Sequence, residues 1–535
     1  MPSSVSFHNL SPVSFLDRSA MVYPNKTAVV YRDLQLTYAE FDERVNRLAG
    51  ALREAGVQKG DRVGFLCPNV PAMLEGHYGP MRIGAVLVAI NFRLSPREIT
   101  YILNHSGSKV LVFDSEFAPK VRQMMDDLKT VNTFVQVVDA AARDEGIPGP
   151  EYESFLASAP PGVHREELDS ELDTIAINYT SGTTGLPKGV EYHARGAYLN
   201  GLGEILEIGM NWRGVYLWTL PMFHCNGWCF TWGVTSVGGT HVCLRRIDPV
   251  EIFGLIRDEG ITHMCAAPTV LTSMYSSPAA EGQDLSGLTI MTAGAPPAPQ
   301  VIRSMEGMGA FIHHAYGLTE TYGPHTICAV QPGWESLPVA ERSRLKSRQG
   351  VPYVVAQTGL RVVDENMEDV PRDGLTMGEV VMQGNNVATG YFDNPEATAE
   401  SFRDGWFHSG DLAVWHSDGY IELQDRAKDV IISGGENISS QEVEKVLMEH
   451  PGVLEVCVIG VPDERWGEVP KAFVVQRAAG GVSGGELIEF CRERIAHFKA
   501  PKYVEFGDLP KTATGKIQKY VLREREWQGI TKRIN

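Results

Sequence analysis

Tyr179-Thr-Ser-Gly-Thr-Thr-Gly-Leu-Pro-Lys-Gly189 places four hydroxyl side chains between Thr180 and Thr184, with three glycines and one lysine, in eleven residues. Glycine allows the backbone to approach a ligand and to direct its N–H groups toward it. The hydroxyls add donors or a ligand for Mg²⁺, and Lys188 adds a mobile positive charge. The preceding residues, 174–178, have the apolar character of a short buried strand, and α/β folds bind ligands at strand ends. The stretch therefore predicts a polyphosphate-binding loop in an α/β protein.

The loop differs from the G-x4-G-K-[ST] pattern of kinases and GTPases. Anchored on Gly182 and Lys188, that pattern needs glycine at 187 and Ser or Thr at 189, where this chain has Pro187 and Gly189. An ordinary phosphotransferase is therefore disfavoured. The competing interpretation is a surface turn rich in small polar residues, and motifs further along the chain decide between the two.

Composition is typical of a large globular enzyme. The chain has 535 residues, 43% of them hydrophobic and 21% charged, which predicts more than one domain. The net charge of −18 disfavours nucleic acid and anionic lipid as partners, so a site for ATP must be locally positive or assisted by a metal.

Neither a secretory signal nor a membrane-spanning segment is expected. The first residues, Met1 to His8, lack a basic start followed by an apolar run, and no stretch of about 18 apolar residues occurs. Eight scattered cysteines fit a reducing compartment better than a disulfide framework. These features predict a cytoplasmic protein.

The order of expected elements indicates a large body and a small C-terminal unit. Thr37-Tyr-Ala-Glu40 is a capping box that starts an amphipathic helix, and apolar runs at 63–67, 84–90 and 110–114 read as buried strands of a parallel sheet. After the charged segment Asp425-Arg-Ala-Lys-Asp429 the pattern restarts as an α+β unit. We therefore expect a body over 1–424, a hinge at 425–429 and a lid over 430–535. Two rigidly packed domains with a charged connector are the alternative.

Four further clusters carry groups suited to nucleotide chemistry. Ala315-Tyr-Gly-Leu-Thr-Glu320 offers an aromatic ring for a base, a hydroxyl for a phosphate and a carboxylate for Mg²⁺. The others are Trp406-Phe-His-Ser-Gly-Asp411, Ser433-Gly-Gly-Glu-Asn437 and Thr512-Ala-Thr-Gly-Lys516. Taken singly, each also fits a structural role as a helix cap, a turn or a solvated charge.

Together and in this order, the clusters resemble the adenylate-forming superfamily of acyl-CoA synthetases, luciferases and peptide-synthetase adenylation domains. The resemblance extends from Thr37 to Lys516. It implies an α/β body with parallel sheets and a hinged lid that reorients between two half-reactions. The resemblance does not decide the oligomeric state, which is either a monomer or a homodimer.

The resemblance also implies roles for individual residues. The positions that match contacts with ATP or AMP are Thr180, Ser181, Gly182, Thr183, Thr184, Lys188, Gly294, Ala295, Pro296, His314, Ala315, Tyr316, Gly317, Thr319, Asp411, Arg426 and Lys516. Thr184 and Glu320 match the Mg²⁺ site, and Lys428 matches the hinge. The implied catalytic residues are Lys516, His224, Thr184 and Glu320.

The implied chemistry joins a small carboxylic acid to coenzyme A. Because the carboxylate and ATP are both anions, Mg²⁺, Lys188 and Lys516 are expected to neutralise charge while acyl adenylate and pyrophosphate form. Rotation of the lid then withdraws Lys516 and brings the loop of Gly434, Gly435 and Glu436 inward. The CoA thiol attacks, and AMP leaves.

The acceptor and the acid are inferred from smaller features. Only 19 residues follow Lys516, so no carrier-protein domain is expected there and CoA is favoured. Pro221-Met-Phe-His-Cys-Asn-Gly-Trp-Cys229 resembles the acyl and pantetheine passage of fatty acyl-CoA synthetases. His224 would lie by the carboxylate, and Trp228 would gate the passage or serve as a plain core residue.

Two positions depart from the long-chain pattern, which often has Trp after Gly-Gly-Glu and Lys shortly before it. This chain has Asn437 and Ile432 there, so a short or medium aliphatic acid is favoured. An aromatic acid, a sulfur-containing acid such as methylthiopropionate, and a long-chain fatty acid stay as alternatives. A rival hypothesis is a binding protein with a decayed synthetase fold, which would bind ATP without turnover.

Overall fold

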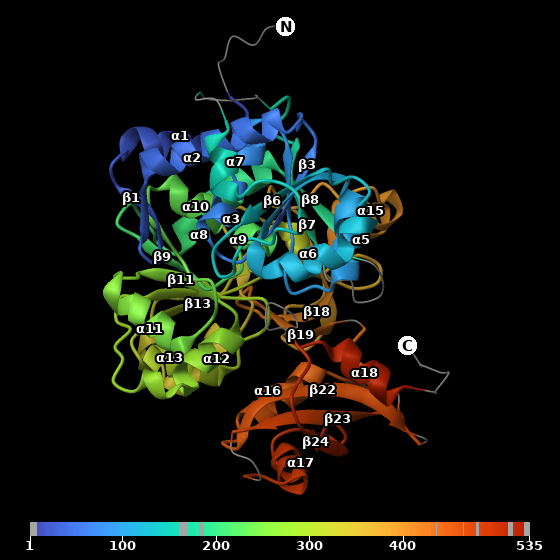
Figure 1. Ribbon diagram of the computed structural model, residues 1–535. Coiled ribbons are helices and arrows are strands. Elements are labelled where there is room, and N and C mark those ends of the chain that lie inside the picture. Colours follow the sequence, from blue (N-terminus) through green and yellow to red (C-terminus); the bar gives the residue numbers. More distant parts are fainter. Residues whose placement is uncertain are drawn as a thin grey trace, which may run out of the picture.

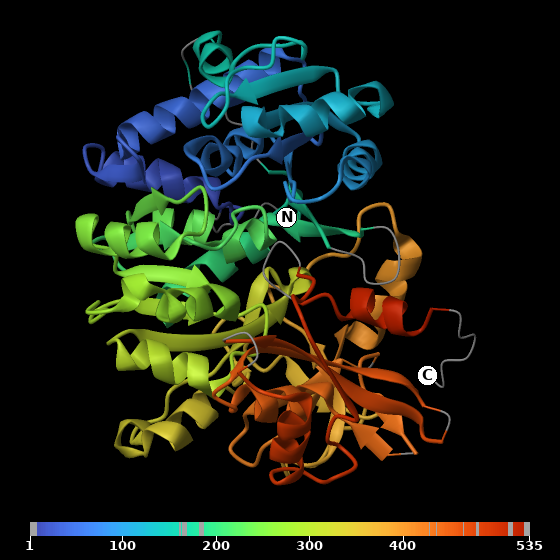
Figure 2. The ribbon, with the colours of Figure 1, turned by 60° about the horizontal axis from the view of Figure 1, so that its bottom comes forward.

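The computed structural model describes residues 8–159, 162, 168–180, 187–426, 428–434, 436–463, 465–477, 481–511 and 517–528. It shows a large body and a smaller C-terminal unit, coloured orange to red in Figures 1 and 2. The strands of the described residues form sheets of nine, six, four and five strands. None of the helices within these ranges has the length and hydrophobicity needed to span a bilayer.

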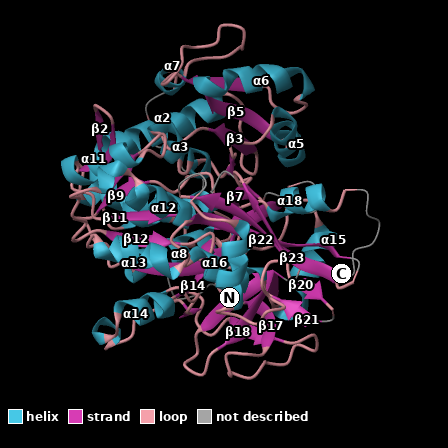
Figure 3. Cartoon of the chain, turned by 90° about the horizontal axis from the view of Figure 1, so that it is seen from below, coloured by secondary structure: helices cyan, strands magenta, loops and turns pink. Residues whose placement is uncertain are grey.

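The six-stranded sheet carries the predicted loop at one edge. Its strands, in spatial order, are β6 (Thr133–Val137), β5 (Ser108–Asp114), β3 (Arg62–Leu66), β4 (Val86–Ala89), β7 (Thr174–Tyr179) and β8 (Gly189–His193). All neighbours pair in parallel except β7 and β8, which are antiparallel. Helices flank these strands in Figure 3, as expected for parallel strands that are buried on both faces.

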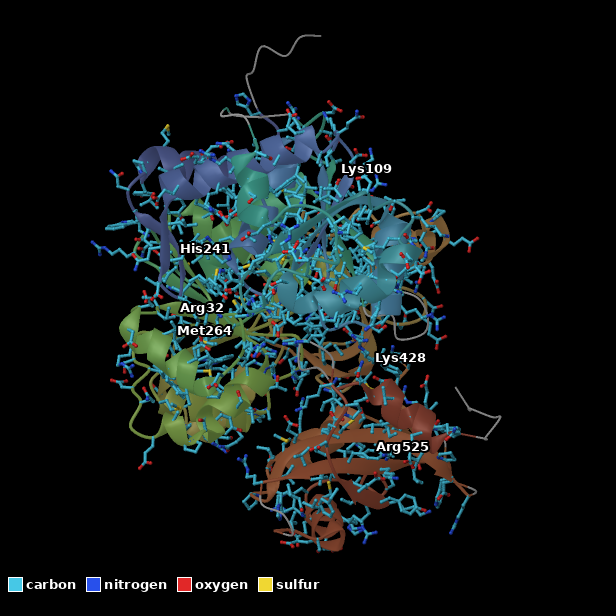
Figure 4. The ribbon with its side chains drawn as sticks, viewed as in Figure 1. Arg32, Lys109, His241, Met264, Lys428 and Arg525 are labelled. Carbon is cyan, nitrogen blue, oxygen red and sulfur yellow. The ribbon has the colours of Figure 1, made fainter. Side chains whose placement is uncertain are left out.

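The nine-stranded sheet forms the other half of the body. Its order is β15 (Val351–Pro352), β14 (Gly323–Ile327), β13 (Phe311–Leu318), β12 (Thr289–Thr292), β11 (His263–Ala266), β9 (Val215–Trp218), β10 (Thr240–Cys243), β1 (Thr27–Tyr31) and β2 (Leu34–Thr37). The central strands from β13 to β1 pair in parallel. Figure 4 labels His241 on β10 and Met264 on β11, both of them buried.

Two antiparallel sheets complete the fold. The four-stranded sheet contains β16 (Leu360–Val363), β17 (Met377–Met382), β18 (Phe407–Trp415) and β19 (Ile421–Arg426). The C-terminal sheet contains β21 (Glu436–Ile438), β20 (Ile431–Ser433), β23 (Gly467–Gln476) and β22 (Val453–Asp463), with β24 (Tyr503–Phe506) parallel to β23. The C-terminal unit has its own core, which includes Val443, Leu447, Val458 and Val474.

The helices pack around these sheets. They are α1 (Val13–Val22), α2 (Tyr38–Glu54), α3 (Pro71–Gly76), α4 (Gly79–Arg82), α5 (Pro96–Ser106), α6 (Ala118–Met124), α7 (Tyr152–Ala157), α8 (Ala194–Glu207), α9 (Cys225–Trp228), α10 (Phe230–Ser236), α11 (Pro249–Asp258), α12 (Pro268–Ser276), α13 (Pro299–Gly307), α14 (Val339–Lys346), α15 (Pro395–Ser401), α16 (Ser440–Met448), α17 (Gly484–Arg492) and α18 (Lys519–Glu526).

The predicted α/β class, with parallel sheets in a large body and a smaller α+β unit, is confirmed. The expected capping box of α2 forms between Thr37 and Glu40. In the small unit, Ser439 caps α16 by accepting a hydrogen bond from the backbone N–H of Glu442. The predicted strand at 84–90 is shorter, because only Val86–Ala89 pairs with its neighbours. The domain boundaries at 424/425 and 429/430 stay predictions.

Candidate active site

The predicted phosphate loop joins two paired strands. Tyr179 at the end of β7 is opposite Gly189 at the start of β8. Next to this pair, the backbone N–H of Thr180 donates to the carbonyl of Lys188 over 2.9 Å. The loop is therefore closed at its base by strand pairing, which fixes the point from which Lys188 extends. Ser181, Gly182, Thr183 and Thr184 lie outside the described residues.

Lys188 and Glu320 meet at Tyr391. The Nζ atom of Lys188 lies 4.7 Å from the centre of the Tyr391 ring, and the Tyr391 hydroxyl donates to Oε1 of Glu320 over 2.7 Å. Burial raises the pKa of the Glu320 carboxyl, while the bond from Tyr391 and the charges of Arg426 and Lys188 oppose the rise. The pKa of this buried carboxyl is thus raised overall, and its oxygens lie close to two cations and are of the kind that a divalent metal ion binds.

Tyr391 itself was missed by the sequence interpretation. The segment that carries it is fixed by backbone bonds: Ala388 N–H donates to the Glu320 carbonyl over 2.8 Å, and Tyr391 N–H donates to the Thr398 hydroxyl over 2.9 Å. The run Gly390-Tyr-Phe392 has no pattern that marks the tyrosine hydroxyl as functional. Only the fold brings it between Lys188 and Glu320.

A second group joins Asp411, Tyr316 and Arg426. Asp411 on β18 is directly opposite Arg426 on β19, and Nε of Arg426 lies 3.2 Å from Oδ1 of Asp411. The Tyr316 hydroxyl donates to Oδ2 of the same carboxylate over 2.7 Å. Burial lowers the pKa of Arg426, but Asp411 and Asp429 raise it overall, so the guanidinium stays charged. Both oxygens of this carboxylate are therefore held in place, which suits it to accept hydrogen bonds from two adjacent hydroxyl groups.

The expected adenine walls lie at the ends of neighbouring strands. Thr292 of β12 is opposite His314 of β13, so the turn of Gly294, Ala295 and Pro296 follows β12 beside the run 314–317. Gly294 has φ of 87°, which the left-handed backbone of this turn requires. Burial lowers the pKa of His314 to about 4, which keeps its ring neutral. Ala315 and Tyr316 are buried, whereas Gly317 is only partly covered.

Thr319 connects this strand end to the predicted acyl passage. It opens the 3-10 turn Thr319–Thr321, and its carbonyl accepts the Tyr192 hydroxyl over 2.6 Å. The Cys225 thiol lies 3.7 Å from the Thr319 hydroxyl, and His224 directly precedes Cys225. The structure therefore brings His224, Thr319 and Glu320 into one region.

The passage segment contains a left-handed turn that the sequence interpretation missed, and this turn is the short element labelled α9. All five residues from Cys225 to Cys229 have positive φ, between 49° and 65°. Each such residue other than glycine costs roughly 1–2 kcal/mol, so the surrounding packing must hold the turn in place. Trp228 is 3% exposed, and a Cβ at Gly323 would lie 2.9 Å from its ring. This burial fits the core interpretation of Trp228; its gating role stays a prediction.

The predicted hinge residue Lys428 and the predicted passage loop of Gly434 and Glu436 lie at the start of the small unit. Lys428 is exposed and lies between the body and the C-terminal unit in Figure 4. Gly434 donates its N–H to the Trp466 carbonyl over 2.8 Å, and Glu436 pairs with Ser433 in the β20–β21 hairpin. Both therefore contact their own unit in this orientation. Gly435 and Lys516 lie outside the described residues.

Comparison with known proteins identifies the family. A model described as AMP-binding enzyme matches residues 16–392, and one described as AMP-binding enzyme C-terminal domain matches residues 442–516. The chain belongs to the AMP-binding enzyme family. This AMP-binding enzyme is 47% identical over 527 residues to 4-hydroxybutyrate–CoA ligase 2 of Metallosphaera sedula, covering 98% of this chain and 95% of the relative.

Two further matches extend over nearly the whole AMP-binding enzyme. It is 44% identical over 539 residues to the peroxisomal acetate/butyrate–CoA ligase AAE7 of Arabidopsis thaliana, covering 96% of this chain and 94% of the relative. Its fold resembles the crystal structure of the anthranilate CoA ligase AuaEII in complex with anthranoyl-AMP. The TM-score is 0.87 at 26% identity, over 98% of this chain and 99% of the other.

Proposed function

We propose that this AMP-binding enzyme is an ATP-dependent acyl-CoA ligase for a short- or medium-chain aliphatic acid. It forms an acyl adenylate with release of pyrophosphate, and then transfers the acyl group to CoA with release of AMP. The observation that supports this best is the connected set of Lys188, Tyr391, Glu320, Arg426 and Asp411, which gathers cations and carboxylates from separate elements. The CoA ligases among its relatives support the same reaction.

The first half-reaction depends on charge neutralisation. The acid is already ionised near neutral pH, so no general base is needed to prepare the nucleophile. Lys188 and Lys516 would reduce the repulsion between the carboxylate and ATP, while Thr319 would bond the α-phosphate and His224 would lie beside the acid. Asp411 would accept the ribose hydroxyls. Gly294, Ala295, Pro296 and residues 314–317 would enclose the adenine.

Magnesium fits the residues around Glu320. The buried carboxyl is oriented by Tyr391 and lies near the base of the phosphate loop, where Thr184 would supply a hydroxyl. Hard cations prefer such oxygen ligands. Bound Mg²⁺ would neutralise phosphate charge.

In the second half-reaction, the small unit would present the β20–β21 hairpin to the body in place of Lys516. Rotation within residues 425–429 would withdraw Lys516 and carry the β20–β21 hairpin, with Gly434, Gly435 and Glu436, toward the body. The CoA thiol would then attack the acyl carbonyl. We also propose that the enzyme is cytoplasmic, which cell fractionation tests. Its assembly as a monomer or a homodimer is tested by light scattering.

The experiment is AMP release measured over a panel of acids with Mg²⁺, ATP and CoA. We expect activity that depends on the acid and is highest for short- and medium-chain aliphatic acids. The panel includes benzoate, cinnamate, methylthiopropionate and long-chain fatty acids, which represent the alternatives. Formation of ADP in place of AMP, or ATP binding without turnover of any acid, would refute the proposal.

A further inference from the structure

Strand β8 connects the predicted phosphate loop to the rest of the candidate site. It starts at Gly189, directly after Lys188, and Gly189 pairs with Tyr179 of β7. The backbone N–H of Phe392 donates to the Gly189 carbonyl over 2.7 Å, so the segment that carries Tyr391 is fixed to the same strand. Any group bonded to β8 therefore has a set position relative to the base of the phosphate loop.

Tyr192 joins this strand to the turn that begins at Thr319. It is a fully buried residue of β8, four positions after Lys188, and its hydroxyl donates to the Thr319 carbonyl over 2.6 Å. The Cys225 thiol hydrogen-bonds the Tyr192 hydroxyl and donates to the Thr319 hydroxyl over 3.7 Å. Both oxygens of Thr319 are thus held, and a hydroxyl that accepts a bond in this way can still donate its proton to a phosphate.

The far end of the same turn is also bonded to β8. Tyr322 directly follows the turn and has φ of 65°, a left-handed conformation that a residue with a Cβ adopts only where its surroundings hold it. The Tyr192 ring stacks on the Tyr322 ring with the centroids 4.0 Å apart. The Tyr322 hydroxyl accepts the His193 N–H over 2.6 Å. Two adjacent residues of β8 therefore hold the two ends of the turn that carries Glu320.

The two parts of the site that Tyr192 joins act on different parts of ATP. In the proposed reaction the phosphate loop holds the β- and γ-phosphates, whereas Thr319 holds the α-phosphate and Glu320 holds Mg²⁺. Their relative position matters while the bond between the α-phosphate and pyrophosphate forms or breaks. During thiolation pyrophosphate has left, so the phosphate loop no longer acts on the reacting group. A residue that only keeps the two parts in register should therefore affect one half-reaction and spare the other.

We propose that Tyr192 is a positioning residue for adenylation, whose hydroxyl keeps Thr319 and Glu320 in register with the phosphate loop. The inference rests on the proposed ligase function and adds to it a residue that acts through Thr319. Such a residue has a large effect where alignment limits the rate, because a misplacement of about 1 Å lowers a rate by up to roughly 100-fold.

The test starts from butyryl adenylate, which the full-length enzyme would consume in two ways. With Mg²⁺ and pyrophosphate, a pyrophosphate oxygen attacks the α-phosphorus, the bond to the acyl oxygen breaks, and ATP and butyrate form. With CoA, the thiol attacks the acyl carbonyl, its proton is released, and AMP leaves. We expect Tyr192→Phe to lower the ratio of ATP formation to thioester formation, measured in single turnovers, by at least about tenfold, because only the first reaction uses both parts of the site. The phenyl ring keeps the stack on Tyr322, and the ratio of two rates on one variant does not depend on the fraction of folded enzyme.

Tyr38→Phe is the matched control. Tyr38 is also fully buried, and its hydroxyl donates to the Gly239 carbonyl over 2.6 Å, so the substitution removes a bond of the same kind and length. It should lower Tm about as much as Tyr192→Phe does and leave the ratio as in wild type.

The possible results separate the inference from the proposed function. If Tyr192→Phe slows ATP formation and thioester formation by the same factor, or changes neither rate, Tyr192 only supports the fold and the inference is overturned, while the ligase stands. If wild type converts butyryl adenylate to neither ATP nor butyryl-CoA, the ligase proposal fails and the inference falls with it.

Discussion

At the scale of single residues, the site depends on side chains that hold other side chains. Glu320 would be the metal ligand, yet its orientation comes from the Tyr391 hydroxyl. Asp411 would hold the ribose, yet Tyr316 and Arg426 fix its two oxygens. The bond from Tyr391 also helps to keep Glu320 ionised, because it opposes the rise in pKa that burial causes. Tyr391 is thus a positioning residue for the proposed magnesium site.

Tyr391→Phe should weaken adenylation and leave the fold intact. The ring would still face Lys188, but the bond to Glu320 would be lost, and a hydrogen bond to a charged group is worth about 1.5–3 kcal/mol. We expect kcat/KM for adenylation to fall roughly 10- to 100-fold, with a higher Mg²⁺ requirement. Because the pKa of Glu320 would rise further, the loss of activity on the acid side should begin at higher pH. Pyrophosphate exchange measured against Mg²⁺ and pH checks this.

Tyr420→Phe is the control for this change. Its hydroxyl donates to the Ala329 carbonyl and does not contact the candidate site. It should leave the Mg²⁺ requirement and the pH profile as in wild type. If the two tyrosine variants behave alike, the role given to Tyr391 is wrong.

At the scale of elements, sequence patterns predicted the helix caps and strands that depend on interactions between residues close together in the chain. The capping box at Thr37 and the buried strand before Thr180 depend on neighbours in sequence, and both formed as predicted. The link from Lys188 through Tyr391 to Glu320 spans some 200 residues and has no local signal. The left-handed turn at 225–229 was also missed, because four of its five residues are not glycine and tertiary packing overrides their preference.

Gly227→Ala should disturb this turn through its packing. Gly227 has φ of 61°, and a Cβ there would lie 2.4 Å from the ring of the fully buried Trp218. Overpacking and backbone strain each cost about 1–3 kcal/mol, so we expect a fall in Tm of several degrees and a loss of activity with every acid. Thermal melts and AMP release measure the two effects.

Gly260→Ala separates strain from packing. Gly260 has φ of 62°, and a Cβ there would meet nothing within 4 Å. Gly260→Ala should therefore be destabilised only by the strain of a positive φ, without any steric clash. Equal losses in the two variants would show that Trp218 does not constrain the turn.

At the scale of the whole molecule, the proposal requires the small unit to serve two reactions in turn. Lys516→Ala should therefore reduce formation of the acyl adenylate by about 100-fold or more, because the cation beside the reacting carboxylate is removed. Thiolation of preformed acyl adenylate should stay within severalfold of wild type. Single-turnover rates of the two steps, measured separately, check this. Equal losses in both steps would contradict the role proposed for Lys516.

The observed orientation of the small unit is held by contacts between β19 and α16. Asp425 accepts the Ser440 N–H over 2.7 Å, and Lys445 forms an ion pair with Glu422 over 2.6 Å. Burial raises the pKa of Glu422, but Lys445 and His416 lower it overall. This pair is therefore intact above the ordinary pKa of glutamate and is lost as the pH falls through the depressed value. Because the pair spans the predicted hinge, it favours one orientation over the other.

Lys445→Met should shift the balance between the half-reactions. A partly exposed pair contributes about 0–1 kcal/mol, which corresponds to a change of up to roughly fivefold in the population of the observed orientation. The step that uses this orientation should slow, and the other should be unchanged or faster. Lys499→Met is the control, because its pair with Glu442, at 2.7 Å, lies wholly within the small unit and should leave the balance alone. Stopped-flow rates of the two steps decide the matter. If Lys445→Met changes both by the same factor, the ion pair between β19 and α16 does not control the orientation.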